Sequence, residues 1–150
     1  MASWGAVRRE APDFAARVQA AFERNRHMTL ATLRRDGSPR ISGTEIEFDG
    51  DDVFVGMMPS SRKALDLLRD PRIAIHGPTA DPPEENRDWI GEGKVAGRAL
   101  EVAVDDPESE GHRFRIDVDE VVFTQLNDAG DRLVIESWHP GRGVEVVERE

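Results

Sequence analysis

Apolar residues in the first part of the chain recur with a helical period. Pro12 stands where the first turn of a helix would begin, and a proline is well tolerated there. The apolar positions that follow are spaced at i, i+4, i+7 and i+8, at Phe14, Val18, Ala21 and Phe22. This spacing predicts an amphipathic helix over residues 12–25, within an N-terminal arm and helix that together span residues 1–25.

Beyond residue 26 the pattern changes to short extended runs that are separated by turn residues. Residues 28–33 are apolar, and Asp36-Gly37 provides a turn into residues 39–48. A second polar turn at residues 49–52 leads into the apolar run 53–58. These three runs predict an antiparallel meander of three strands.

A short helix and a buried strand are predicted next. Residues 61–69 place Ala64, Leu65 and Leu68 on one helical face, which would cover the meander. The helix is expected to end at Asp70-Pro71, and residues 72–76 read as a strand. Residues 78–88 contain three prolines and four acidic residues and are expected to form an exposed loop.

The second half of the chain predicts further strands. Residues 89–104 are long for a strand and contain three glycines, which predicts a bulge or a bend. Residues 113–119 alternate strictly between apolar and charged side chains, which indicates a half-buried antiparallel strand that continues over 121–123. Residues 132–138 form another run, and the valines of the tail could add a strand at an edge or on a partner: Val144, Val146 and Val147.

The number and spacing of these runs predict the fold class. Six or seven short strands with a helix before them and a helix among them indicate a mainly β protein, a small closed antiparallel barrel. A length of 150 residues is typical of one domain, so residues 1–150 are expected to form a single unit.

Composition narrows the classes of function. The net charge of -10 argues against binding a nucleic-acid backbone by general electrostatics. No apolar run is long enough for a membrane span or resembles a signal peptide, and cysteine is absent, so we expect a cytoplasmic protein without disulfides. Any phosphate site in such an acidic chain must be local.

One candidate for a local anion site stands at the start of the helix over 61–69. Arg62 and Lys63 occupy its first turn, where a positive charge is unfavourable next to the helix dipole unless an anion is present. Ser60 and Ser61 add two hydroxyl groups at the same place. Free amide groups, hydroxyls and cations together fit a phosphate, while the alternative is a capped helix whose cations are solvated.

Two other stretches could complete a site. The run at residues 41–48 contains three small residues, Ser42, Gly43 and Thr44, which would let a flat ligand approach the backbone. The corner at residues 138–142 offers the aromatic side chain of Trp138 next to His139 and, three residues after His139, Arg142. The four histidines show no pair at ligand spacing, so no metal site is predicted.

The order of motifs resembles the pyridoxamine 5'-phosphate oxidase-like family of split β-barrel proteins, which bind FMN or the deazaflavin F420. The matching segments are MTLATL, DGSP, SRKA, LRDPRIAI, GRALEV and IESW, at residues 28–33, 36–39, 61–64, 68–75, 97–102 and 135–138. They span nearly the whole chain after the first helix.

The resemblance implies roles for particular residues. The S-R-K segment supplies cations to the flavin phosphate in that family, which would assign Ser61, Arg62 and Lys63 to the cofactor phosphate. The strand after D-G-x-P runs along the flavin ring, a position that Ser42, Gly43 and Thr44 would take. Family members are homodimers with cofactors at the subunit interface, and the tryptophan after I-E-x, here Trp138, would come from the partner, with His139 and Arg142 near the substrate.

The chain also departs from the best-known members of that family. Pyridoxamine-phosphate oxidases carry an Arg and a Lys on the strand after D-G-x-P, where this chain has Glu45 and Glu47. Their C-terminal Arg-x-His is also missing, because the corner reads HPGRGVEV. The resemblance is therefore closer to the small actinobacterial-type members.

We therefore expect a homodimeric oxidoreductase that moves a hydride between FMN or F420 and a small organic substrate, with His139 as a proton donor. The alternative is a non-catalytic carrier of the same fold, which the acids Glu45 and Glu47 would favour. Haem binding, with His27 or His139 as an iron ligand, is a third possibility.

Overall fold

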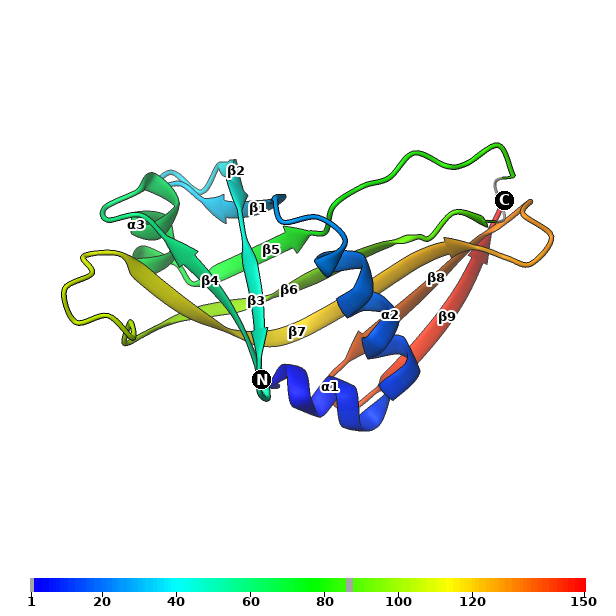
Figure 1. The fold of residues 1–150 in the computed structure, drawn as a ribbon, viewed down its shortest axis with the longest axis horizontal. Coiled ribbons are helices and arrows are strands. Elements are labelled where there is room, and N and C mark those ends of the chain that lie inside the picture. Colours follow the sequence, from blue (N-terminus) through cyan, green and yellow to red (C-terminus); the bar gives the residue numbers. More distant parts are fainter. Residues whose placement is uncertain (1, 86–87) are drawn as a thin grey trace.

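The computed structural model describes residues 2–85 and 88–150. Within these residues the chain forms nine strands and three helices (Figure 1). The helices are α1 (Trp4–Glu10), α2 (Pro12–Glu23) and α3 (Arg62–Arg69). The strands are β1 (Met28–Leu33), β2 (Pro39–Thr44), β3 (Ile46–Asp49), β4 (Asp52–Met57), β5 (Arg72–His76), β6 (Glu92–Val102), β7 (His112–Leu126), β8 (Leu133–His139) and β9 (Gly143–Arg149). Among these described residues no helix has the length and apolar character that crossing a membrane requires.

All strands belong to one antiparallel sheet, and β7 is its central element. The hydrogen-bonded order is β2-β1-β5-β6-β7-β4-β3. One edge of β7 pairs with β6 along most of its length, while the other edge is shared: its first residues pair with β4 and its last residues pair with β8, which in turn pairs with β9. The β8–β9 hairpin therefore extends the sheet beyond the barrel, toward α1 and α2 (Figure 1).

The predicted mainly antiparallel β fold is confirmed, but the number of strands is higher than predicted. The run 39–48 is two strands, because the chain leaves the ladder at Glu45, between β2 and β3. The valines of the tail form β9, which pairs with β8 of the same chain. Because β2 and β3 lie at the two ends of the strand order and are joined through Glu45, the barrel is split rather than closed by a ladder.

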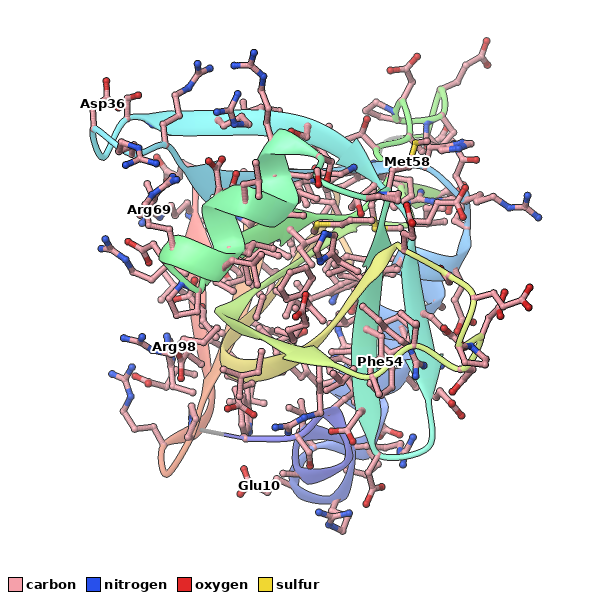
Figure 2. The ribbon with its side chains drawn as sticks, turned by 90° about the vertical axis from the view of Figure 1, so that its left-hand side faces the viewer. Glu10, Asp36, Phe54, Met58, Arg69 and Arg98 are labelled. Carbon is pink, nitrogen blue, oxygen red and sulfur yellow. The ribbon has the colours of Figure 1, made fainter. Side chains whose placement is uncertain are left out.

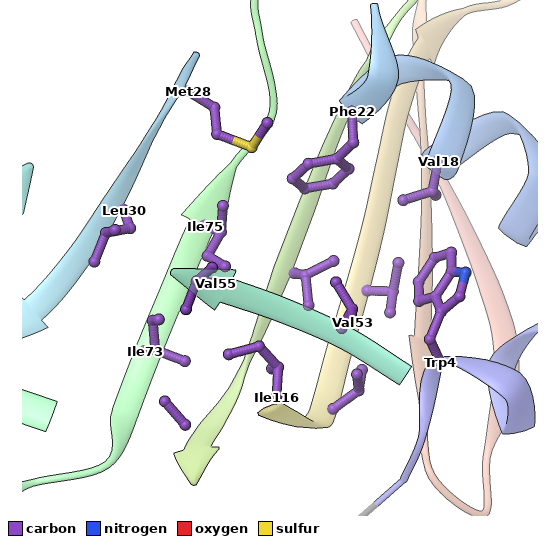
Figure 3. Close-up of a cluster of buried hydrophobic side chains, with 14 of the residues drawn as sticks. Trp4, Val18, Phe22, Met28, Leu30, Val53, Val55, Ile73, Ile75 and Ile116 are labelled. Carbon is purple, nitrogen blue, oxygen red and sulfur yellow. The ribbon is translucent and has the colours of Figure 1, made fainter. Parts of the chain in front are cut away.

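The core fills the inside of the curled sheet and is covered by the N-terminal helices (Figure 3). Val53 and Val55 of β4 face Ile116 of β7, and Phe22 of α2 packs over the same interior. Burial of these side chains is the main source of stability in a chain without cysteine.

The sequence pattern missed α1. Ser3 caps it by accepting a hydrogen bond from the amide of Ala6 at 3.1 Å, and Trp4 and Val7 are fully buried. Trp4 lies 5.1 Å from Phe48 between ring centroids. The helix has only seven residues, which leaves too little apolar periodicity to be recognised in the sequence.

The buried face of α3 also differs from the prediction. Ala64 and Leu67 are buried, together with Asp66, whereas Leu65 and Leu68 are exposed. The helix turns this face inward because Asp66 binds side chains of the sheet, so a polar contact sets the helix rotation. The predicted bulge is confirmed between Ala96 and Gly97, where a Cβ on Gly97 would lie 1.9 Å from the carbonyl oxygen of Asp117.

Candidate functional site

A cationic pocket lies between the edge strand β2 and the N-terminal end of α3. Its volume is about 340 Å³. Four cations and four smaller or apolar residues line it: Arg34, Arg40, Arg62, Lys63, Ile41, Ser42, Gly43 and Ser61. Five of the residues predicted to bind a cofactor are therefore brought together from two segments about 20 residues apart.

The cations of the cationic pocket differ in how they are held. The ammonium of Lys63 donates a hydrogen bond to the carbonyl oxygen of Gly43 at 2.6 Å, which ties α3 to β2. The Nε of Arg40 donates to Asp66 at 2.7 Å. No hydrogen bond or ion pair joins Arg62 to any other described residue, so its guanidinium is free to bind a ligand.

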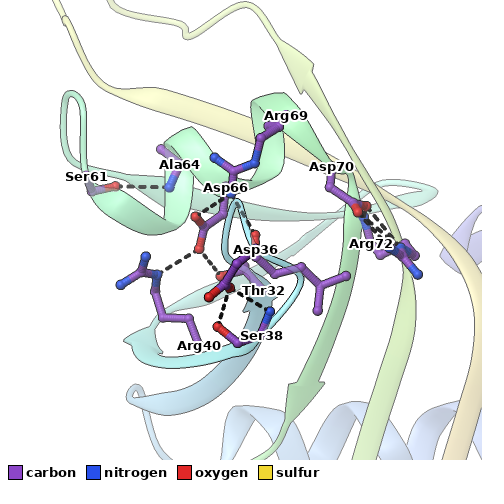
Figure 4. A network of polar contacts seen from close by, with 11 residues as sticks. Thr32, Asp36, Ser38, Arg40, Ser61, Ala64, Asp66, Arg69, Asp70 and Arg72 are labelled. Atoms are coloured by element: carbon purple, nitrogen blue, oxygen red, sulfur yellow. Dashed lines mark hydrogen bonds and ion pairs between the residues drawn. The ribbon is translucent and has the colours of Figure 1, made fainter.

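Asp66 organises the base of this pocket (Figure 4). Its carboxylate accepts hydrogen bonds from Thr32 at 2.8 Å, Arg40 at 2.7 Å and Arg69 at 3.0 Å, and the residue is 3% exposed. Burial alone would raise the pKa of Asp66, but these hydrogen bonds outweigh burial and lower the pKa below its usual value. Asp66 is therefore an ionised anchor for Arg40.

The start of α3 adds donors to the cationic pocket. Ser61 caps the helix by accepting a hydrogen bond from the amide of Ala64 at 3.4 Å. The amides of a first helical turn have no partner within the helix, and the helix dipole favours an anion beside them. In a protein of net charge -10, this pocket concentrates four positive side chains. It is suited to a phosphate.

A row of paired residues crosses the outer face of the sheet from this pocket. Residues that lie opposite each other in neighbouring strands point to the same face. Ladder pairs connect Ile41 to Ala31, Ala31 to Ala74, Ala74 to Ala96 and Ala96 to Glu120. We call this the outer row: Ile41, Ala31, Ala74, Ala96 and Glu120, followed by His139 on β8. At about 4.8 Å between strands, it is roughly 24 Å long.

The middle of the outer row forms a second pocket, the sheet pocket, of about 260 Å³. Its floor is small and mostly apolar, with three alanines from β1, β5 and β6. Ile41 borders both the sheet pocket and the cationic pocket, so the two adjoin. Small side chains leave a shallow surface that a flat ring could contact.

Glu120 and His139 end the outer row. Glu120 lines the sheet pocket, and the Nε2 atom of His139 lies 2.8 Å from its carboxylate. Val121 and Trp138 pair at the preceding ladder position with their side chains in the core, which turns His139 to the outer face. The Nδ1 atom of His139 is buried and has no partner among the described residues.

Comparison with known families identifies the family to which this fold belongs. The family model of pyridoxamine 5'-phosphate oxidase matches residues 14–136, which is most of the chain. The chain belongs to this family. No curated protein matches its sequence significantly.

Solved structures share the fold of the pyridoxamine 5'-phosphate oxidase family at low identity. A pyridoxamine 5'-phosphate oxidase-related, FMN-binding protein from Nostoc punctiforme PCC 73102 is 13% identical, with TM-score 0.61, covering 100% of this chain and 98% of its own. PhzG from Burkholderia lata 383, in complex with tetrahydrophenazine-1-carboxylic acid, is 14% identical, with TM-score 0.62. The match covers 95% of this chain and 89% of PhzG. An F420 reductase is 15% identical, with TM-score 0.53. The match covers 69% of this chain and 94% of the reductase chain.

Three of the residues predicted to bind the cofactor lie away from the cationic pocket. Thr44 is 5% exposed, on the inner face of β2. Trp138 is 1% exposed in the core of its own chain, and its Nε1 donates to Glu10 at 2.8 Å. Arg142 is exposed in the β8–β9 turn, 3.8 Å from Glu145.

Sequence reasoning also missed residues of the site. Arg34 and Arg40 line the cationic pocket, and Glu120 links the sheet pocket to His139. Arg40 directly follows the D-G-x-P turn, two positions before Ser42, so the alternation of β2 could have placed it on the same face. Within residues 2–85 and 88–150, no three His, Asp or Glu side chains converge as metal ligands.

Proposed function

We propose that this protein is an oxidoreductase that binds FMN or F420 and transfers a hydride to or from a small organic substrate. It would differ from a pyridoxamine-phosphate oxidase, because Glu45 and Glu47 replace the cations of that strand and the C-terminal Arg-x-His is missing. The observation that carries the proposal is the cationic pocket at the start of α3, which shares the lining residue Ile41 with the sheet pocket.

The cationic pocket supports binding of the cofactor phosphate. Arg62 supplies an unpaired guanidinium, and Ser61 and Ser42 supply hydroxyls to the lining of the same pocket. Charge-assisted hydrogen bonds to phosphate are roughly twice as strong as neutral ones. Asp66 supports the pocket by fixing Arg40 from behind.

The outer row supports binding of the flat ring and the proton step. When bound, the cofactor would supply the hydride chemistry, and the protein would supply binding and orientation. The alanines would contact the ring, and Glu120 would orient the His139 imidazole. His139 would hold a proton at Nε2 beside the Glu120 carboxylate, which lines the sheet pocket.

A homodimer with cofactor sites at its interface is part of this proposal. Ile41 is 76% exposed, and Ala74, two strands further along the outer row, is also exposed, so the outer row presents apolar surface to a second copy. Light scattering measures the mass of the purified protein directly. A mass of 16.7 kDa, that of one chain, would contradict the dimer.

The test of the phosphate site is the double variant Arg62→Ala/Lys63→Ala, titrated with FMN and with F420. Removal of two charged donors is expected to weaken binding about 100-fold, because each such hydrogen bond contributes about 1.5 kcal/mol or more. Arg26→Ala/Arg98→Ala removes the same charge from two exposed sites outside the pocket and should bind as the wild type does.

The outcomes separate the possible functions. If the Arg62/Lys63 variant binds both cofactors as tightly as the wild type, the phosphate site is misplaced. If the wild type binds a cofactor but the bound, reduced cofactor transfers no hydride in a panel of acceptors, the protein is a carrier rather than an enzyme. A Soret band on adding haem, without flavin binding, would support the haem alternative.

A further inference from the structure

The turn that leads into the cationic pocket contains an unusual backbone conformation. Ser60 has a φ of 53°, which no other non-glycine residue adopts within residues 2–85 and 88–150. The amide of Ser61 donates to the carbonyl oxygen of Met58 at 3.2 Å, which closes a four-residue turn with Pro59 in the second position. Proline second and a positive φ third are the features of a type II turn, whose third residue is normally glycine.

A histidine from β7 holds this turn. The backbone amide of Ser60 donates to the Nε2 atom of His112 at 3.3 Å. In a type II turn the central peptide is flipped relative to a type I turn, so its N–H group points in the opposite direction. A side chain that accepts from this N–H group therefore favours the flipped form and offsets the strain of serine in the left-handed region.

The hydrogen bond defines the protonation state of His112. Because a backbone amide can only donate, Nε2 must be the unprotonated nitrogen, and the ring proton is on Nδ1. Nδ1 lies 2.7 Å from the carboxylate of Glu101 on β6, to which it donates. A second proton would occupy Nε2 and remove the acceptor of the Ser60 amide.

The surroundings of His112 leave Glu101 as its charged partner among the described residues. On β4, the ladder partner of His112 is the apolar Met57, and on β7 the Phe114 ring stacks at 6.2 Å. Arg113, the next residue, lies over Phe54 and pairs with Glu47. The turn before β7 carries further acids, Asp105, Asp106, Glu108 and Glu110.

We propose that His112 is a pH-sensitive latch on the cationic pocket. Neutral His112 accepts the Ser60 amide and fixes the turn that presents Ser61, Arg62 and Lys63; protonated His112 releases it. Anion affinity in the cationic pocket then falls between pH 8 and pH 5, the interval in which histidine changes its charge. The anion in this statement rests on the proposed function, whereas the latch itself does not.

A charge effect alone would have the opposite sign. A positive charge gained at His112 would attract an anion, but its field is screened by solvent over about 8 Å at physiological salt. The hydrogen bond, in contrast, acts directly on the residue before Ser61. A fall in affinity on acidification therefore indicates the latch, and a rise indicates electrostatics alone.

The decisive variants are His112→Gln and His112→Asn. Glutamine can place an acceptor where Nε2 lies and does not titrate, whereas the asparagine amide reaches only as far as Nδ1. With FMN as the probe, the wild type is expected to lose about five-fold more affinity than His112→Gln between pH 8 and pH 5. Titration of the FMN phosphate affects both proteins equally and cancels in this ratio. A constant ratio would overturn the latch.

A second measurement does not require a cofactor. In the protein without ligand, the ¹⁵N-¹H resonance of Ser60 should move with the titration of the His112 imidazole, and its amide should exchange faster at low pH after correction for intrinsic exchange. If the chemical shift of the Ser60 resonance does not change as His112 titrates, the latch is disproved even if FMN binds. If the wild type binds neither FMN nor F420, the proposed function fails, and the Ser60 resonance still decides the latch.

Rescue by a second substitution distinguishes a latch from general loss of structure. His112→Asn should weaken FMN binding about five-fold at pH 8. Adding Ser60→Gly supplies a residue that adopts a positive φ without strain, so it should restore most of this affinity. No recovery in the double variant would indicate that His112 acts through something other than the turn.

Discussion

Two pockets of opposite charge lie on either side of the turn at Met58–Ser61. The cationic pocket has a volume of about 340 Å³ and four basic side chains, of which those of Arg34 and Arg62 form no hydrogen bond or ion pair with another described residue. The other, which we call the acidic pocket, has a volume of about 680 Å³. It is lined by three acids, Glu45, Glu47 and Glu110, and by Phe54, Met57 and Met58. Figure 2 shows Met58 and Phe54 on the side of β3 and β4, away from Arg69 at the other end of α3.

The difference between the two pockets shows that the ion-pair and hydrogen-bond partners of a charged side chain decide whether it can bind a ligand. The nearest group to the Glu45 carboxylate is His27, at 3.2 Å, and Glu47 lies 3.5 Å from Arg113, so these acids are held away from the cationic pocket. The position of Glu45 and Glu47 in the sequence suggested that they would oppose an anion at α3. Their pairing with His27 and Arg113 means that they do not. The smaller pocket is the one suited to phosphate, because its donors converge and Arg62 is free.

Charge reversal in the two pockets should give the largest contrast. Arg62→Glu/Lys63→Glu replaces attraction with repulsion and should weaken FMN binding about 1,000-fold, or roughly 4 kcal/mol. The matched reversal Glu45→Lys/Glu47→Lys should leave binding unchanged or slightly tighter. Fluorescence titration measures both. Equal losses in the two variants would show that FMN does not distinguish the pockets.

Removal of the Asp66 carboxylate should lower stability, because Asp66 binds three side chains behind the cationic pocket. Asp66→Asn is expected to reduce the free energy of unfolding by about 2 kcal/mol. Since the pKa of Asp66 is lowered on folding, its contribution is complete above the usual aspartate pKa, about 3.9, and is lost as the pH falls through the folded pKa. Urea unfolding at pH 7 and at pH 3 measures this.

The Asp66 experiment has an internal check. The difference in stability between the wild type and Asp66→Asn should shrink at the lower pH, where the wild-type carboxylate begins to be protonated. A difference that grows on acidification would mean that Asp66 is not an ionised anchor for Arg40.

The helix cap should have the smallest effect. Ser61→Ala removes the hydroxyl that accepts from the Ala64 amide, which should lower the free energy of unfolding by about 1 kcal/mol. Ser61→Thr keeps the hydroxyl and should behave like the wild type. Thermal unfolding of the two variants provides the comparison. Identical melting temperatures would show that the Ser61 cap does not stabilise α3.

Local signals in the sequence predict much of the cationic pocket. The Ser61-Arg62-Lys63 helix start was recognised because capping and dipole effects depend on neighbouring residues in the chain. Arg40 was missed because its role depends on Asp66, 26 residues later, which turns an unexpected face of α3 inward. Trp138 and His139 were grouped together, although adjacent strand residues point to opposite faces.

The sequence by itself determined the local elements: most of the strands, the amphipathic helix, the bulge at Gly97 and the anion-binding character of the start of α3. These follow from side-chain period, turn residues and sterics within a few positions. Only the tertiary structure decided that Ile41, three alanines, Glu120 and His139 form one row, and that Trp138 faces the core. The reason is physical: strand register depends on contacts between distant segments, and a shift of one residue would reverse which face each side chain occupies.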